Sequence, residues 1–303
     1  LRPVLASFEK NDILRRTLLI AVAFGADFGG IATPVGTGPN AIAIASISHA
    51  QPVSFISWML FAFPLTLGML VLSFSLLIWR GQKNENAWSD RNEKLIGMLP
   101  KNEYSKGFGS NQKIFLAILL ITAIGWLTEP LHDVPSSVIA LGAAASLFIA
   151  GVLTKEDLHR IEWSTLLLIS GGITLGKLFE QSAIVKTIAT GIPFADLHPM
   201  LSLFLLCLTS ATLSALMSNS ATVILLIPLA TAFIPSPSTA ILVAISASFG
   251  IPFIISTPPN TMAFGQGGVK FGDVFWPGVL MMILGCALIS LTGKQILSFA
   301  GIP

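Results

Sequence analysis

Charged residues are scarce in this sequence. They make up 11% of its 303 residues, whereas soluble domains carry about 25%. Hydrophobic residues make up 53% of the chain, which is more apolar material than a soluble domain can hide behind a wet surface. The shortage of charge therefore predicts an integral membrane protein with several spans.

Three further shortages exclude other classes of protein. The 17 Lys and Arg residues and the 15 Asp and Glu residues leave a net charge of +2, so there is no basic face for a nucleic-acid partner. The two cysteines, Cys207 and Cys286, lie in apolar runs and are expected to be small buried or lipid-facing side chains. The sequence contains no Gly-x-Ser-Gly motif, no His-Glu-x-x-His motif and no pair of membrane aspartates, so we expect neither an enzyme nor a cofactor.

Uncharged runs predict the membrane spans, because a helix needs roughly 20 apolar residues to cross a bilayer core of about 30 Å. Val53–Trp79 carries no charged residue and predicts one span. A polar loop, residues 80–113, follows it, and a short amphipathic segment, residues 182–192, is expected to lie at an interface. The other predicted spans and half-spans are 14–28, 41–47, 114–128, 134–153, 162–178, 200–217, 223–233 and 274–297.

Basic residues indicate which side of the membrane each loop faces. When the sides alternate at each predicted crossing, Lys177, Lys186 and Lys294 fall on one side and every other Lys and Arg falls on the opposite side. The side with the excess is cytoplasmic by the positive-inside rule. We therefore expect a multi-pass protein of the plasma (inner) membrane with the 80–113 loop in the cytoplasm.

Glycines and prolines interrupt the apolar runs at two related places. Residues 33–40 include two prolines and two glycines, so they cannot form a continuous helix. A shift of 220 positions places Gly30 on Gly250, Thr37 on Thr257 and Asn40 on Asn260. The predicted crossings give the two copies opposite directions, which is typical of the inverted repeats of secondary transporters.

A third interruption, residues 218–222, lies within the stretch from Leu197 to Val269, which contains no charged residue. It joins two apolar segments, of which the second is short. Two complete crossings would place this joint in an outside loop. A re-entrant hairpin would place it near mid-membrane, where irregular backbone needs protein or a water-filled cavity around it. The count of basic residues is the same in both cases, so the sequence leaves both open.

Broken helices can bind ions without charged side chains. A break exposes N–H groups at one new helix end and C=O groups at the other, and each end carries about half an elementary charge. Carbonyl and side-chain oxygens can coordinate Na⁺, whereas N–H and hydroxyl groups can hold a carboxylate or a sulfate. These neutral groups avoid the cost of a lone charge at mid-bilayer, about 2.5–3.5 kcal/mol.

The residues at the interruptions resemble a known family. The motifs are Ser-Asn-Ser-Ala-Thr at 218–222, Thr-Pro-Pro-Asn at 257–260 and Gly-Gly-Ile-Ala-Thr-Pro-Val-Gly-Thr-Gly-Pro-Asn at 29–40. They are similar to the paired motifs of the divalent anion/sodium symporter family, whose members carry dicarboxylates, citrate or sulfate. The resemblance covers nearly the whole chain. It implies a homodimer with a scaffold part, a transport part that moves like an elevator, and two re-entrant hairpins.

The resemblance also implies which residues bind substrate and sodium. The substrate contacts carried over to this chain are Ser218, Asn219, Ser220, Thr257, Pro258 and Thr37. The sodium contacts carried over are the side chains of Asn219 and Ser214 and the main-chain carbonyls of Met217, Ser256 and Pro258, with the carbonyl of Gly36 for a first sodium ion.

The sequence departs from the family pattern in three respects. The family's first hairpin should precede Leu14, and the sequence has no such segment there, so we expect an N-terminal part to be missing. Ser220 stands in place of the usual Thr, and Gly38 stands in place of the usual Pro. Both lie in the expected substrate pocket, so the identity of the anion stays open.

Three polar residues near the breaks are candidates for coupling. Asp27 is ionisable and lies just before the first break; it is either a proton or cation site or an ordinary helix-terminal Asp. Asn40 and Asn260 are either ion contacts or helix caps at a kink.

We therefore expect an all-α polytopic membrane protein with inverted repeats, broken helices and a re-entrant hairpin. The expected parts are a first transport part (13–80), a cytoplasmic loop (81–112), scaffold spans (113–192) and a second transport part (197–297) with its hairpin tip at 218–222 and its break at 256–260. The expected function is sodium-coupled symport of a divalent anion, with a dicarboxylate such as succinate or malate ahead of citrate or sulfate. The expected partners are this anion, Na⁺, membrane lipid and a second copy. A proton-coupled or arsenite-type anion carrier is the alternative.

Overall fold

The computed structural model describes residues 13–48, 52–82, 109–161 and 197–302, together with single residues between 163 and 187. All regular secondary structure in these segments is helical, which confirms the predicted all-α fold. By length and composition, four of the described helices could cross a membrane. They are α4 (Phe55–Gln82), α6 (Ser110–Leu127), α12 (Pro199–Leu216) and α16 (Phe271–Phe299).

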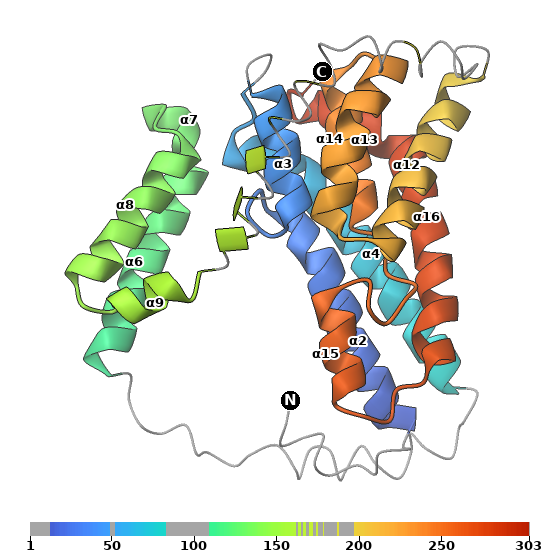
Figure 1. The fold of residues 1–303 in the computed structure, drawn as a ribbon, viewed down its shortest axis with the longest axis horizontal. Coiled ribbons are helices and arrows are strands. Elements are labelled where there is room, and N and C mark those ends of the chain that lie inside the picture. The colour runs from blue at the N-terminus through green and yellow to red at the C-terminus, as the bar shows by residue number, and fades with distance from the viewer. Residues whose placement is uncertain are drawn as a thin grey trace.

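Two long helices, α4 and α16, extend along the length of the bundle (Figure 1). Their 28 and 29 residues correspond to about 42–44 Å of helix, which is enough to cross a bilayer at a tilt. Near the start of α16, the Asp273 carboxylate lies 3.2 Å from the Arg16 guanidinium and 3.3 Å from the Arg80 guanidinium. This charge cluster ties both long helices to α2 (Ile13–Gly29).

Two helices are broken. After α2, the 3-10 turn η1 (Gly30–Ala32) leads into irregular residues 33–37, and α3 (Gly38–Ile47) follows. Likewise, residues 248–257 separate α14 (Pro237–Ala247) from α15 (Pro258–Gly265). The predicted interruptions therefore exist, but their bounds need correction, because residues 38–40 and 258–260 already belong to the following helices. Proline in the first turn of a helix costs no hydrogen bond, so these prolines start helices rather than interrupt them.

The two broken helices run side by side in opposite directions (Figure 1). The first half of one contacts the second half of the other: α2 packs against α15, and α3 packs against α14. This crossed packing brings the two breaks together. Glycines allow the approach of the surrounding helices, because a Cβ atom on Gly250 would lie 2.7 Å from the carbonyl oxygen of Ala211 on α12, and one on Gly278 of α16 would lie 2.7 Å from the Cα of Pro252.

The helices α12 and α13 (Asn219–Phe233) form a hairpin that reverses within the bundle. Both pack against α14 as well as against each other. Figure 1 shows that they enter from one end of the bundle and that the reversal lies part way along α16. Only Met217 and Ser218 separate the two helices. Of the two alternatives that the sequence left open, this geometry favours the hairpin.

The short helix α15 is fastened to α2 at both ends. At its C-terminal end, the Arg15 guanidinium donates hydrogen bonds to the carbonyl oxygens of Gln266 and Gly267 at 2.8 and 2.7 Å. A cation in this place also interacts favourably with the helix dipole. At the N-terminal end, the Thr257 hydroxyl donates to the Asp27 carboxylate at 3.1 Å.

A second group of helices lies to one side of the bundle (Figure 1). It consists of α6, α7 (Glu129–His132), α8 (Ser136–Ile149) and α9 (Lys155–His159), with α6 packed against α8. The backbone N–H of Phe55 donates to the Glu129 carboxylate at 2.8 Å, and the Phe55 ring stacks on Trp126 with the ring centroids 4.7 Å apart. Thr122 is the one buried residue of α6, and α8 has none, so the apolar faces of both helices are open in the described chain.

Several expectations fall outside the described residues. These are the loop between residues 83 and 108, most of the predicted span 162–178 and most of the segment 182–192. The division of the chain into transport and scaffold parts therefore stays a prediction. Cys207 and Cys286 are buried free thiols, in agreement with the small core residues expected.

Candidate substrate and ion site

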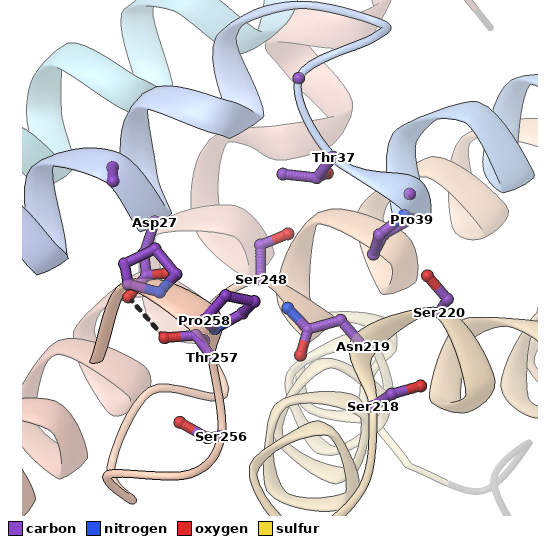
Figure 2. Close-up of a pocket in the computed structure, with 14 residues that line it drawn as sticks. Asp27, Thr37, Pro39, Ser218, Asn219, Ser220, Ser248, Ser256, Thr257 and Pro258 are labelled. Atoms are coloured by element: carbon purple, nitrogen blue, oxygen red, sulfur yellow. Dashed lines mark hydrogen bonds between the residues drawn. The ribbon is translucent and has the colours of Figure 1, made fainter. Parts of the chain in front are cut away.

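The hairpin tip forms one wall of the site. Ser218 caps α13, with its hydroxyl accepting a hydrogen bond from the backbone N–H of Ala221 at 3.1 Å. The Ser214 hydroxyl donates to Oδ1 of Asn219 at 2.6 Å. This bond fixes the orientation of the Asn219 amide, so that its Nδ2 group is turned toward the space between the tip and the two breaks (Figure 2).

The two breaks share the same local geometry. Thr37 and Thr257 are the extended N-cap residues of α3 and α15, with φ/ψ of −142/153° and −134/149°. One residue earlier, Gly36 and Ser256 each donate a backbone N–H to the carbonyl three residues back, at 3.1 and 3.2 Å. The 220-residue match in the sequence therefore reflects two equivalent turns.

The paired asparagines, Asn40 and Asn260, stabilise these turns through hydrogen bonds to main-chain carbonyl oxygens. Nδ2 of Asn40 donates to the carbonyl oxygens of Gly30, Ile31 and Thr33, and Nδ2 of Asn260 donates to that of Ile251. Both side chains are fully buried, and neither lines the cavity described next. In the structure, the two predicted coupling candidates therefore hold the backbone of the breaks in place.

A cavity of about 370 Å³ lies between the hairpin tip, the two breaks and the end of α2 (Figure 2). Its volume is in the usual range for a small-molecule site. The lining residues are Ala26, Asp27, Gly36, Thr37, Gly38, Pro39, Ser218, Asn219, Ser220, Ser248, Ser256, Thr257, Pro258 and Pro259.

The cavity brings together most of the predicted site residues. All six predicted substrate contacts line it, and so do Asp27, Gly36 and Ser256. Two predicted sodium contacts do not. Ser214 lies behind the tip, hydrogen-bonded to Asn219, and Met217 ends α12 beside it.

The two departures from the family motif meet in this cavity. A Cβ atom on Gly38 would lie 2.5 Å from the hydroxyl oxygen of Ser220, so the hairpin tip reaches the first break through these residues. Glycine at position 38 leaves room for the Ser220 hydroxyl, so a small residue at one of these positions accommodates the residue at the other.

Polarity in the cavity comes from helix ends and hydroxyl groups. The N-terminal residues of α3, α13 and α15 all line it, and helix N-termini attract anions. Among the described residues, the lining contains no Lys, Arg or His, and Asp27 is its one ionisable residue. Asp27 lies at the end of α2 and is 8% exposed, with the Thr257 hydroxyl as its partner.

Ser248 is a lining residue that sequence reasoning missed. It is 2% exposed, and neither its hydroxyl nor that of Thr37 has a hydrogen-bond partner within the described residues. Its one sequence signal is a hydroxyl two positions before Gly250, at the start of the second break. The surrounding apolar run made that serine look like an ordinary helix residue.

Comparison with known proteins shows which family the sequence resembles. The sequence pattern of the citrate transporter family matches residues 2–240. The human Na⁺/dicarboxylate cotransporter 3 is 30% identical over 94% of this chain and 57% of its own length. An uncharacterized transporter of Methanocaldococcus jannaschii is 29% identical over 93% of this chain and 65% of its own. The Na⁺/citrate cotransporter of Rattus norvegicus is 25% identical over 94% of this chain and 60% of its own.

The chain thus spans about three fifths of the length of these relatives. Their names are those of transporters, as the broken helices indicated, and the match covers the tip and the first break. The chain belongs to the citrate transporter family, among the divalent anion/sodium symporters that its motifs resemble.

Proposed function

We propose that the protein is a sodium-coupled symporter of a divalent anion, with a dicarboxylate as the substrate. The observation that carries the proposal is the cavity between the hairpin tip and the two breaks. Its described lining presents helix N-termini and hydroxyl groups but no basic side chain. Relatives named for sodium-dependent transport of dicarboxylates or citrate support it.

The charge balance of the cavity favours coupling to cations. Three helix N-termini supply about half an elementary charge each, which is less than the two negative charges of a dicarboxylate. Asp27 adds negative charge when it is ionised. Sodium ions bound nearby would supply the missing positive charge, so the anion and the cations would each bind more tightly in the presence of the other.

Oxygen atoms suited to sodium lie beside the tip. The hydroxyl of Ser214 and the amide oxygen of Asn219 are in contact at 2.6 Å, and Ser256 and Pro258 line the adjacent part of the cavity. We assign one sodium site to these residues together with the Met217 carbonyl. The Gly36 carbonyl is assigned to a second site at the first break.

The proposal includes the movement and the assembly. The antiparallel packing of the two broken helices supports an inverted repeat. The hairpin that reverses within the bundle supports a re-entrant position in the membrane. The open apolar faces of α6 and α8 suit lipid or a second copy of the chain, so a homodimer with an elevator-like transport part in the plasma membrane completes the proposal.

The test is uptake of labelled succinate and malate into proteoliposomes that contain the protein. We expect uptake to require an inward sodium gradient and to fall strongly in Asn219→Ala. Equal uptake in sodium-free buffer would contradict sodium coupling. Uptake driven instead by a proton gradient, and made independent of pH by Asp27→Asn, would support the alternative of a proton-coupled carrier, which the position of Asp27 in the lining makes worth testing.

A further inference from the structure

The two equivalent threonines of the cavity have different hydrogen-bond partners. The hydroxyl of Thr257 donates its single proton to the Asp27 carboxylate at 3.1 Å and accepts the backbone N–H of Asn260 at 3.3 Å. It therefore has no proton for a ligand and presents only its remaining lone pair. The hydroxyl of Thr37 is unpartnered in the described chain, so it remains able to donate.

The helix ends show the same difference. The first two residues of α15 are Pro258 and Pro259, which have no N–H group, and the third N–H is the one bonded to Thr257. By contrast, α13 begins with Asn219 and Ser220 and α3 begins with Gly38, so those two helices retain N–H donors in their first turn. The cavity consequently has a donor side at α3 and α13 and an acceptor side at α15.

Asp27 defines the chemistry of the acceptor side. An ionised carboxylate accepts hydrogen bonds and repels a second carboxylate. No basic side chain in the described part of the chain lines the cavity to offset this charge. The arginines of α2 and α4 are bonded elsewhere: Arg15 to main-chain carbonyls after α15, and Arg16 and Arg80 to Asp273. A ligand carboxylate therefore fits the donor side, whereas an O–H group fits the side of Asp27 and Thr257.

We propose that Asp27 and Thr257 form a subsite for a hydroxyl group, so that the protein selects 2-hydroxydicarboxylates over unsubstituted dicarboxylates. This inference rests on the proposed function, because it assumes that a dicarboxylate binds in the cavity. An O–H donor facing an ionised carboxylate makes a charge-assisted hydrogen bond, which is stronger than a neutral one. The analogue without the hydroxyl would leave that acceptor without a partner.

The test compares malate with succinate, which differ by one hydroxyl group, in sodium-dependent binding and uptake by the reconstituted protein. We expect malate to bind about tenfold more tightly, the size of one hydrogen bond to a charged group. In Asp27→Asn the charge is lost while the shape and a neutral acceptor oxygen are kept, so the ratio of the two affinities should fall to about threefold. Thr257→Ser keeps the hydroxyl and should keep the ratio.

The control is Asp133→Asn, the same change at an exposed residue in the left-handed conformation that Asn tolerates well. It should leave the ratio unchanged. If Asp27→Asn does not fold, the wild type still decides, because equal binding of malate and succinate to the wild type overturns the subsite. An unchanged ratio with weaker sodium binding in Asp27→Asn also overturns it. Absence of sodium-dependent binding for both acids would instead refute the proposed function.

Discussion

The approach of α12 to the second break gives a sharp test of how the site is supported. In Gly250→Ala the new methyl group would lie 2.7 Å from both the carbonyl oxygen of Ala211 and the backbone nitrogen of Ala215, and 2.8 Å from the Cβ of Ser214. Two of these atoms are backbone, so a change of rotamer cannot relieve the contact. The α12 helix or the break has to move, and overpacking of this kind costs about 1–3 kcal/mol.

The expected result is a lower melting temperature of the purified protein together with weaker sodium binding. The displaced segment carries Ser214, whose hydroxyl orients Asn219, so stability and binding should fall together. The matched control is Gly142→Ala in α8, where no atom of another described element lies within 4 Å of the new Cβ. Alanine is favoured over glycine within a helix by about 1 kcal/mol, so this variant should melt at or above the wild-type temperature. If Gly250→Ala behaves like Gly142→Ala, the reasoning about close packing is refuted.

Three further variants test separate parts of the structure. Ser214→Ala removes the 2.6 Å bond to Asn219 and should weaken sodium binding about 3–10-fold, the range for one neutral hydrogen bond; an unchanged sodium titration would contradict this. Asn40→Asp replaces the amide donor that faces three carbonyl oxygens, so it should lower the thermal stability far more than Asn40→Ser; equal melting curves would argue against this stabilising role. Asp273→Asn weakens a part-exposed cluster with two arginines and should cost only about 1 kcal/mol, less in high salt, as measured by unfolding at two salt concentrations.

The sequence predicts the parts of the site that depend on local geometry. Prolines and glycines at residues 33–40 cannot continue a helix, and the Thr, Pro and Asn that recur 220 positions later, at 257, 259 and 260, predict a second turn of the same kind. Short uncharged segments around residues 218–222 predict a reversal. These features follow from backbone chemistry within a few residues, so they can be found without tertiary contacts.

Contacts between distant segments could not be predicted in this way. Asp27 and Thr257 are 230 residues apart in the sequence, and nothing in either segment identifies the partner. The opposite roles of the Thr37 and Thr257 hydroxyls do not show in the repeat, because both threonines stand two positions before a Pro-Asn pair and Asp27 is the partner of Thr257 alone. Ser248 lies in an apolar run that gives no sign of a binding site. Its place in the lining depends on the packing of α12 and α16 around the second break.

The bounds of the breaks show a third kind of limit. Pro258 and Pro259 break a helix when they occur in its interior, yet they are well suited to its first turn. The sequence alone reveals the disruption but not on which side of it the next helix begins. Once Thr257 is the N-cap, both prolines fall in the first turn of α15.

The double attachment of α15 has a consequence for how the cavity can open. One end of this helix is bonded to Arg15 and the other to Asp27, and both partners belong to the single helix α2. A helix that is hydrogen-bonded to the same neighbour at both ends cannot rotate about one end, so α15 is unsuited to act as a gate by itself. Opening of the cavity on that face requires α2 and α15 to move together, which leaves the hairpin tip opposite them as the less constrained wall.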